Sequence, residues 1–247
     1  MPLRFTGCSF GYRARTPVLT SLTLDLPTGC TVLLGPNGAG KSTLLSLGAS
    51  ILVPGRGQVL LGRLDSAQRR DRADYRRRVG WLPQAIHPVP GLTVREQAAY
   101  AGWLKGLSRR QAWDASAAAL GRVRLTELAD RPSRELSGGQ LRRLGIAQTL
   151  VHRAEVVLLD EPTAGLDPVQ RGVFRDLLAD LSEKVSFVVS THQTEDLADI
   201  YRTVIVLDRG EVTFQGDIGG FLSLAGHEAS AERQAEQAYR GLVRGEV

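Results

Sequence analysis

The stretch Gly35-Pro-Asn-Gly-Ala-Gly-Lys-Ser42 matches the pattern G-x-x-x-x-G-K-[ST]. It follows the apolar run TVLLG at 31–35, an expected strand, and precedes LLSLGASILV at 44–53, an expected buried helix. Glycines let consecutive backbone N–H groups point inward, and a helix N-terminus adds positive potential, so this loop is typical of a phosphate cradle. In such a loop Lys41 reaches the β and γ phosphates and Ser42 is a ligand for Mg²⁺. A glycine-rich connector without a ligand is the plainer alternative.

The composition places this loop in an ordinary folded protein. The chain has 247 residues, of which 43% are hydrophobic and 23% charged, close to globular averages. Its net charge of +5 suits an anionic ligand, an acidic membrane or nucleic acid without choosing among them. Cys8 and Cys30 show neither a metal spacing nor a disulfide framework, which predicts a reducing compartment and no structural zinc. The sequence has no run of 18 apolar residues and its N-terminus lacks the apolar core of a signal peptide, so we expect no membrane span and no secretion.

The apolar pattern predicts an α/β core. Alternation at 3–6 and again at 22–26 predicts two half-buried antiparallel strands. The nearly all-apolar runs at 156–160, 187–190 and 203–207 are typical of strands covered on both faces of a parallel sheet.

Two segments are expected to be helical. Between Thr93 and Glu135 the composition shifts to Ala, Leu, Glu, Gln and Arg, with apolar positions at loosely helical intervals at Leu104, Trp113, Ala117 and Leu120. The tail from His227 carries one apolar helix face made of Ala235, Ala238, Tyr239 and Leu242. We therefore predict a helical insertion and a short C-terminal helix that docks on the core.

Two acids end the apolar run VVLLD. Asp160 and Glu161 are adjacent, so their side chains diverge, and one carboxylate can hold the metal's water shell while the other addresses an attacking water. Solvated acids at a strand end are the alternative. Gln84, which ends GWLPQ after an expected edge strand, offers an amide oxygen to Mg²⁺, but its position alone does not distinguish it from an ordinary loop glutamine.

A second anion site is predicted at Leu136-Ser-Gly-Gly-Gln140. Ser137 lies where a helix N-cap belongs, before the apolar run LRRLGIAQTLV. A plain capped helix needs the serine but not two glycines and a glutamine, so the pattern favours an exposed helix N-terminus that binds an anion.

The segments GPNGAGKST, Gln84, LSGGQ, VVLLDEP, AGLD and STH, in that order, resemble the nucleotide-binding domain of ATP-binding cassette (ABC) proteins. The resemblance covers roughly residues 3–217. It implies a P-loop NTPase fold of the α/β class with a mostly parallel core sheet, an antiparallel β subdomain and a helical subdomain carrying the signature LSGGQ. It places the nucleotide-binding domain at 1–225, with the helical subdomain at about 93–140, and leaves 226–247 as the C-terminal helix.

The resemblance also implies roles for individual residues. Catalytic roles fall to Glu161 as base, to His192 at the γ-phosphate and to Gln84, which links the site to a partner. The implied Mg²⁺ ligands are Ser42, Gln84 and Asp160. Asp167 helps to join two halves, and Tyr12 stacks on adenine, unless Phe10 on the same strand face does so. The implied nucleotide-binding set is Tyr12, Gly35, Asn37, Gly38, Gly40, Lys41, Ser42, Thr43, Ser137, Gly138, Gly139, Gln140 and Asp167.

In this family the signature of one copy faces the cradle of another, so the resemblance implies a head-to-tail homodimer, or a pair with a paralogous ATPase subunit. ATP closes the pair and hydrolysis reopens it. The favoured hypothesis is an ATP-hydrolysing transporter subunit, cytoplasmic and peripheral on the inner face of the cell membrane, whose permease is a separate integral-membrane chain. The segments around Gln84 and the signature are similar to single-domain ATPases of bacterial export systems, which predicts export. The insertion at 93–135, with the Gln84 loop, is expected to contact the permease, and no residue identifies the cargo.

Two other classes remain as alternatives. A soluble ATPase of the same superfamily in DNA repair or on the ribosome would use Arg69, Arg70, Arg72 and Arg76 to Arg78 as a nucleic-acid patch. Those relatives resemble paired cassettes in one chain or a cassette split by a heptad insertion, and neither occurs here, so no nucleic-acid partner is expected. A small-molecule kinase would leave LSGGQ and His192 unexplained.

Overall fold

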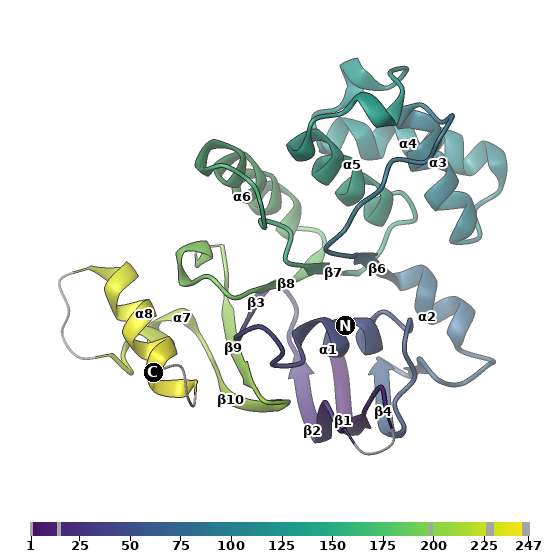
Figure 1. Cartoon of the computed structure of the whole chain (residues 1–247). Helices are drawn as coiled ribbons and strands as arrows, with labels where there is room; N and C mark the ends of the chain where they lie inside the picture. The colour runs from purple at the N-terminus through teal and green to yellow at the C-terminus, as the bar shows by residue number, and fades with distance from the viewer. Residues whose placement is uncertain (1, 14–15, 198–199, 226–229, 244–247) are drawn as a thin grey trace.

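The computed structural model describes residues 2–13, 16–197, 200–225 and 230–243. Figure 1 shows two sheets below a helical lobe, with the C-terminal helices at the far side of the larger sheet from that lobe. The smaller sheet is antiparallel, in the order β2-β1-β4-β5. Its strands are β1 (Leu3–Phe10), β2 (Leu19–Leu26), β4 (Arg56–Leu61) and β5 (Leu64–Asp65). The two antiparallel strands predicted from alternation, β1 and β2, are thus confirmed.

The larger sheet has the order β10-β9-β3-β8-β7-β6. All neighbouring pairs are parallel except β9 and β10, which are antiparallel. Its strands are β3 (Cys30–Leu34), β6 (Val79–Leu82), β7 (Val156–Asp160), β8 (Ser186–Thr191), β9 (Thr203–Asp208) and β10 (Glu211–Gly216). Every residue of β3 and β7 is buried, as the apolar runs predicted.

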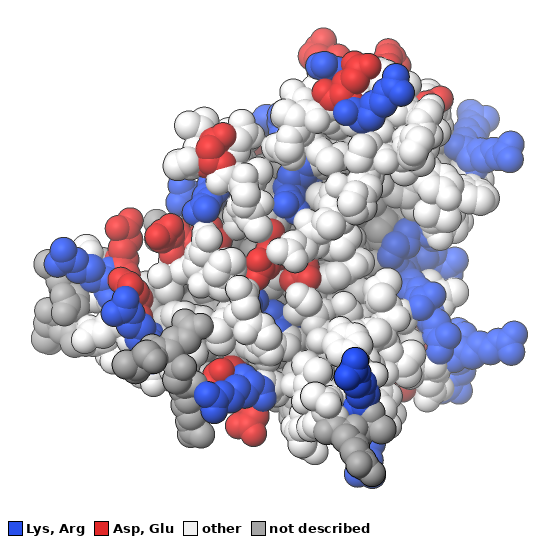
Figure 2. Space-filling view, viewed as in Figure 1, with Lys and Arg blue, Asp and Glu red and all other residues white. Residues whose placement is uncertain are grey.

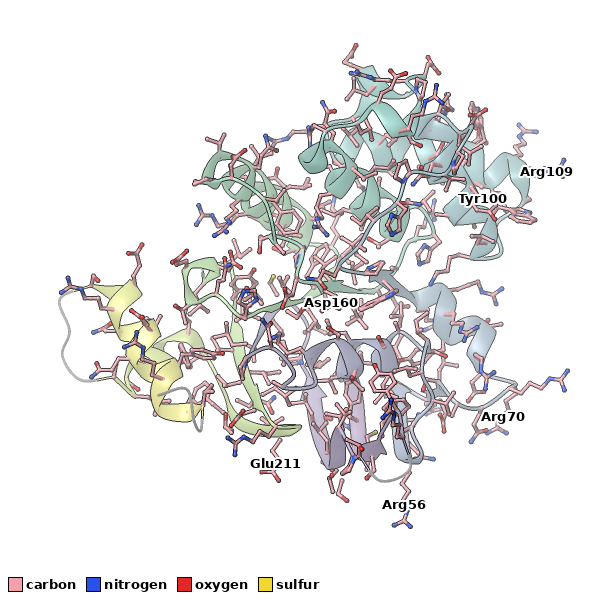
Figure 3. The ribbon with its side chains drawn as sticks, viewed as in Figure 1. Arg56, Arg70, Tyr100, Arg109, Asp160 and Glu211 are labelled. Atoms are coloured by element: carbon pink, nitrogen blue, oxygen red, sulfur yellow. The ribbon has the colours of Figure 1, made fainter. Side chains whose placement is uncertain are left out.

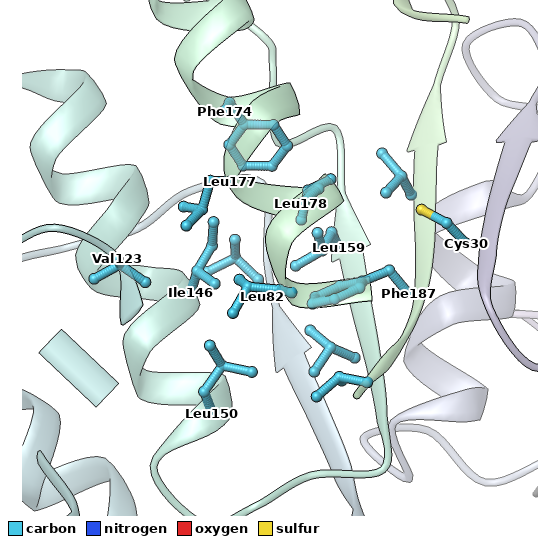
Figure 4. Close-up of a cluster of buried hydrophobic side chains, with 14 of the residues drawn as sticks. Cys30, Leu82, Val123, Ile146, Leu150, Leu159, Phe174, Leu177, Leu178 and Phe187 are labelled. Carbon is cyan, nitrogen blue, oxygen red and sulfur yellow. The ribbon is translucent and has the colours of Figure 1, made fainter. Parts of the chain in front are cut away.

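The core lies on both faces of this sheet. Cys30, Val32 and Leu34 of β3 belong to one buried cluster, whereas Leu33 belongs to the other, because successive side chains of a strand point to opposite faces. Figure 4 shows part of the first cluster, in which Phe174 and Leu178 pack near Phe187 beside the helical lobe. The second cluster joins the antiparallel sheet to the parallel one.

Helices cover the sheets and form the lobe. Their bounds are α1 (Lys41–Gly48), α2 (Arg72–Arg78), α3 (Val94–Leu104), α4 (Arg109–Arg122), α5 (Gly138–Leu150), α6 (Pro168–Ser182), α7 (Ile218–Leu222) and α8 (Ala231–Leu242). Three single 3₁₀ turns are η1 (Thr126–Leu128), η2 (Ser133–Glu135) and η3 (Thr194–Asp196). None of the helices within the described ranges is both long and apolar enough to cross a bilayer.

The helix predicted from LLSLGASILV is only half right. Helix α1 ends at Gly48, and Ile51 and Val53 beyond it are 60% and 49% exposed. Ser50 has φ +55°, a left-handed conformation that a helix cannot continue through. The apolar run therefore extends into a turn, and its last residues face outward.

The helical insertion forms, but most of the apolar positions that indicated it are not buried. Of the four positions singled out, only Leu120 is buried, whereas Leu104, Trp113 and Ala117 are exposed. The face of α4 that packs inward is made of small residues, among them Ala112, Ser116 and Ala119. Both α3 and α4 begin with a capping box, in which the N-cap side chain and the N3 side chain satisfy each other's backbone N–H group.

In the C-terminal segment, α8 packs against β9, α7 and η3. Ala235 and Ala238 are buried, and Tyr239 and Leu242 pack half-buried against the first core cluster. The spacing read from the sequence therefore matches the face that α8 turns inward. The domain boundary at 225 stays a prediction.

Candidate functional site

The predicted functional residues follow four neighbouring strands at one edge of the parallel sheet. The cradle follows β3, His192 follows β8, Asp160 ends β7, and Gln84 follows β6. Because β6, β7, β8 and β3 are adjacent and parallel, their carboxyl ends meet at the same edge, which is where ligands bind in open α/β sheets. In Figure 3 Asp160 lies at this edge, between the helical lobe and the antiparallel sheet.

A cavity of about 330 Å³ opens above the cradle. Gly38 and Gly40 line it with φ angles of +83° and +104°, which a residue with a side chain adopts only under strain. Gly35 passes so close to β9 that a side chain there would collide with the Leu207 carbonyl oxygen. The cavity lining is Tyr12, Val18, Asn37, Gly38, Gly40, Lys41, Ser42, Thr43, Gln84 and Glu161.

Lys41 is the first residue of α1 and is only 5% exposed. Its ammonium donates to the carbonyl oxygens of Gly35 at 2.7 Å and Pro36 at 3.0 Å, and lies 3.7 Å from Oε1 of Glu161. Burial lowers the pKa of Lys41, an effect that the carboxylates of Glu161 and Asp160 oppose. The chain thus holds a partly desolvated positive charge at the N-terminus of α1.

Ser190 joins the two adjacent acids. Its hydroxyl donates to Oδ1 of Asp160 at 2.7 Å and accepts from the backbone N–H of Glu161 at 2.9 Å. Glu161 has φ +43°, so the chain turns sharply after β7 and the two side chains leave in different directions. Ser190 was not predicted as a functional residue. The only feature of the sequence that could have indicated it is its position at the start of the STH triplet.

Three predicted catalytic residues meet at the Glu161 carboxylate. Oε1 lies 3.1 Å from Nδ1 of His192, and Oε2 accepts from Nε2 of Gln84 at 3.3 Å. Gln84 is therefore not merely a loop residue facing solvent, which its position in the sequence had left open. Since its amide nitrogen faces Glu161, its amide oxygen is left for another partner.

Tyr12 lies at the outer end of the cavity, and 66% of its surface is exposed. Its hydroxyl lies 3.3 Å from Oγ1 of Thr43, and its ring packs edge-on against Phe10 with 5.1 Å between centroids. Phe10 does not line the cavity, so of the two aromatic candidates Tyr12 has the position to meet a ligand.

The signature segment caps a helix but lies outside this cavity. Ser137 is the N-cap of α5: its hydroxyl accepts from the N–H of Gln140, and Oε1 of Gln140 accepts from the N–H of Ser137. Gly138 has open space above it, and a side chain on Gly139 would collide with Gln170 of α6. Gly139 thus lies against the end of the Gln170 side chain. The residues lining the cavity include none from 136–140.

Asp167 also stays away from the cavity within one chain. Its carboxylate caps α6, accepting from the N–H of Gln170 at 2.8 Å. The structure therefore brings the predicted residues of the cradle, Asp160, Glu161, His192, Gln84 and Tyr12 to one edge, and leaves the signature and Asp167 on a separate surface.

Asp196 is a further residue that sequence reasoning missed. Its Oδ2 accepts from the hydroxyls of Thr163 at 2.8 Å and Thr191 at 2.6 Å. It thereby ties the turn after Glu161 to the end of β8, next to His192. An acid inside the polar stretch QTED gave no periodic or motif signal.

Comparison with known proteins agrees with this fold. The sequence profile of the ABC transporter family matches residues 19–164. The chain is 38% identical over 219 residues to the cobalt import ATP-binding protein CbiO of Rhodobacter capsulatus, covering 87% of this chain and 78% of that protein. It is 36% identical over 192 residues to the uncharacterized ABC transporter ATP-binding protein YxlF of Bacillus subtilis, covering 76% of this chain and 62% of YxlF.

Among solved structures, CbiO1 of Clostridium perfringens, part of the ABC transporter complex cbiONQ, superimposes with a TM-score of 0.76 at 27% identity, covering 87% of this chain and 88% of that one. The chain belongs to the ABC transporter family and is an ATP-binding ATPase subunit of that family. The P-loop NTPase fold expected from the resemblance is confirmed.

Proposed function

We propose that this chain hydrolyses ATP to drive a membrane transporter whose permease is a separate chain. The observation that carries the proposal is the meeting of Lys41, Gln84 and His192 around the Glu161 carboxylate at the cradle. A carboxylate in this position is suited to take a proton from a water that attacks the γ-phosphorus. The bond between that phosphorus and the oxygen bridging to the β-phosphate then breaks, giving ADP and phosphate.

The other groups stabilise charge in this reaction. Lys41 supplies a positive charge next to the phosphates, and the backbone N–H groups of the loop with the α1 N-terminus add to it. His192 contacts both Glu161 and the γ-phosphate, so it holds the base close to the reacting atoms. Tyr12 stacks on the adenine at the outer end of the cavity.

Mg²⁺ fits the residues present. Ser42 and Gln84 line the cavity, and the buried Asp160 directly precedes Glu161, which lines it too. These residues offer a hydroxyl, an amide oxygen and a carboxylate, the oxygen ligands that Mg²⁺ prefers. We propose that these three hold the ion. When bound, it neutralises charge that develops on the phosphates.

A single chain lacks the second wall of the nucleotide site, because the signature does not line its cavity. We propose that two copies, or this chain and a paralogous subunit, pack head to tail, so that Ser137, Gly138, Gly139 and Gln140 of one face the cradle of the other. Asp167 then lies at the joint between them. ATP bridges the two chains, and loss of the γ-phosphate lets them part.

The permease contact falls on a groove between α2, α3 and the Gln84 loop. Two cavities of about 500 and 280 Å³ meet there and share Trp81, Leu104 and Lys105 in their walls. Leu104 is 61% exposed and lines both cavities, so it offers an apolar contact to a partner seated there. The groove adjoins Gln84, so a permease seated there can sense the catalytic site. We propose that the chain acts at the cytoplasmic, inner face of the membrane, where such a permease would bind it.

The sequence and the relatives indicate opposite directions of transport. The sequence segments predicted export, whereas the Rhodobacter capsulatus relative is named as a cobalt import protein. The relatives therefore favour import, and export stays a prediction without support from them. Transport of a labelled cargo into or out of sealed vesicles would decide between the two.

The arginines that the nucleic-acid alternative would use lie on α2 and just before it. Figure 2 shows Lys and Arg side chains along the side formed by α2 and by the outer ends of α3 and α4. Most of the arginines of this patch already have protein partners. Arg77 pairs with Asp74, Arg78 with Glu155, and Arg70 with Asp71. Arg72 and Arg76 donate to backbone carbonyl oxygens of the chain itself.

The permease contact can be tested by purification from native membranes in mild detergent. A tagged wild-type chain is expected to recover an integral-membrane protein in stoichiometric amount. Leu104→Arg replaces an apolar contact with a charge in a groove that Arg76, Arg77 and Lys105 also line. It is expected to lower that recovery at least about tenfold, because an unpaired charge buried in an interface is costly. ATP hydrolysis by the purified chain is expected to stay within about twofold of wild type, since Leu104 is outside the cradle.

Leu224→Arg is the matched control, because Leu224 is an equally exposed leucine next to α7, away from the groove. It should leave the membrane partner bound. Recovery of ribosomes or nucleic acid in place of a membrane protein would overturn the proposal. An equal loss of the membrane protein in both variants would show that the groove is not the permease contact.

A further inference from the structure

Arg142 connects the signature helix to both loops that carry the catalytic residues. It lies in the second turn of α5, five residues after Ser137. Its Nη1 donates to the carbonyl oxygen of Gln84 at 2.8 Å, and its Nη2 donates to the carbonyl oxygen of Ala164 at 3.4 Å. One planar guanidinium thus reaches two loops that are distant in sequence, which a single ammonium cannot do with the same fork of donors.

The first of these bonds fixes the loop of Gln84. The backbone of Gln84 is held by α5, while its side chain reaches Oε2 of Glu161 at 3.3 Å. The loop holds no helix or strand between Leu82 and Val94, so its position depends on bonds of this kind. A shift of α5 is therefore passed through Gln84 to the Glu161 carboxylate.

The second bond fixes the turn after Glu161. The N–H of Ala164 donates to the carbonyl oxygen of Glu161 at 3.2 Å, so Ala164 belongs to the turn that Glu161 begins. Asp196 holds the same turn from the other side through Thr163. The turn then leads to Asp167, three residues after Ala164, at the start of α6.

The neighbouring residue, Arg143, makes different contacts. Arg143 is half-buried like Arg142, but its Nη1 donates to the carbonyl oxygens of Val123 and Arg124 at the end of α4. Arg143 therefore holds the helical lobe together, whereas Arg142 points to the catalytic edge. Burial lowers the pKa of both guanidinium groups, and both remain charged at neutral pH.

We propose that Arg142 is a positioning residue that keeps the signature helix, Gln84 and the turn after Glu161 in register, so that a change at the signature helix changes the placement of the catalytic carboxylate. This rests on the proposed function of Glu161 and Gln84. Arg142 does not line the cavity above the cradle, so it acts on the rate of the chemical step and not on the affinity of the cradle.

The test compares Arg142→Met, Arg142→Lys and Arg143→Met in steady-state ATP hydrolysis and in equilibrium ATP binding. Arg142→Met removes both hydrogen bonds and is expected to lower kcat about tenfold, since small misplacements of catalytic groups have effects of this size. The Kd for ATP should stay within twofold, because Lys41 and the loop are unchanged. Arg142→Lys can restore the bond to Gln84, so its kcat is expected to be at least about threefold higher than that of Arg142→Met.

A double-mutant cycle with Gln84→Ala shows whether Arg142 acts through Gln84. If it does, the kcat of the double variant should lie within about twofold of the kcat of Gln84→Ala alone. Arg143→Met, the matched control, should keep kcat within about twofold even where its melting temperature falls.

Three results would overturn the inference: a kcat for Arg142→Met within twofold of wild type, effects of Arg142→Met and Gln84→Ala that multiply in full, or an equal loss of kcat in Arg143→Met. If Arg142→Met does not fold, Arg142→Lys decides, because a kcat below that of Arg143→Met at unchanged Kd supports the inference and an equal kcat overturns it. These failures leave the proposed function standing as long as the wild-type chain hydrolyses ATP. A wild-type chain that is as inactive as Lys41→Ala would instead overturn the proposed function.

Discussion

Lys41→Ala is expected to lower the rate of ATP hydrolysis by at least about a thousandfold, because it removes the positive charge held closest to the developing phosphate charge in a partly desolvated site. ATP affinity should fall as well, since the ammonium contacts phosphate in the ground state too. The fold should persist, because the rest of the cradle is backbone, and Gly35 and Pro36 lose only a donor to their carbonyl oxygens. Phosphate release and isothermal titration with ATP measure the two losses, and circular dichroism checks the fold.

Lys105→Ala is the matched control for this variant. Lys105 is a half-buried lysine that, like Lys41, donates to two backbone carbonyl oxygens, those of Arg76 and Val79, both at 2.8 Å. It lies outside the cradle, so its loss should change hydrolysis by the isolated chain less than about threefold. Hydrolysis by Lys41→Ala at the wild-type rate would contradict the assignment of residues 35–42 as the phosphate site.

Glu161→Gln is expected to lower the hydrolysis rate by about a hundredfold or more while ATP still binds. The amide has nearly the shape of the carboxylate and can keep contact with Gln84 and His192, but it cannot take a proton from water. ATP therefore stays intact between the two chains, and the closed dimer should accumulate. Size-exclusion chromatography with ATP and Mg²⁺ should show a stable dimer that the wild-type chain forms only transiently.

Glu155→Gln controls for the loss of a carboxylate next to β7. Glu155 precedes β7 at its other end and pairs with Arg78 at the surface, so its amide variant should hydrolyse ATP at close to the wild-type rate. If Glu161→Gln instead stays monomeric at saturating ATP and hydrolyses normally, Glu161 is not the base.

The parallel strands and the cradle could be predicted from sequence because each depends on local pattern. The buried runs ending at Leu34 and Asp160 are apolar on both faces, and only a covered parallel sheet needs that. The end of α1 could not be predicted, because LLSLGASILV stays apolar past Gly48 and the turn at Ser50 is set by contacts with other segments, including the bond from its hydroxyl to Ser66.

The exposure of Leu104 and Trp113 shows the same limit in the helical lobe. Their spacing fits a helix, but Leu104 ends α3 with its side chain exposed. Helix α4 packs Ala119 and Leu120 inward and leaves Trp113 outward. Spacing identifies a helix without saying which face a neighbouring element covers.

The candidate site was predictable where a residue belongs to a contiguous motif and not where it acts through a tertiary contact. Lys41, Asp160 and Glu161 follow directly from their neighbours in sequence. Ser190, Asp196 and Arg142 matter because of what they touch, 30, 33 and 58 residues away from their respective partners Asp160, Thr163 and Gln84. Only the fold brings those partners together.

The central claim, that each ATP site is shared between two chains, is tested most directly by mixing two inactive variants, Lys41→Ala and Ser137→Arg. In a mixed dimer one site combines both defects, and the other combines an intact Lys41 with an intact Ser137 of the opposite chain. Random mixing of equal amounts makes about half of the dimers mixed, so up to roughly a quarter of the wild-type hydrolysis rate should return if the sites act independently. ATP-dependent dimer formation should be measured beside phosphate release, because cooperative sites can suppress turnover with one good site. Recovery of activity on mixing is the result that the shared site predicts. Absence of both hydrolysis and ATP-dependent dimers, with both variants folded and exchanging subunits, would contradict it.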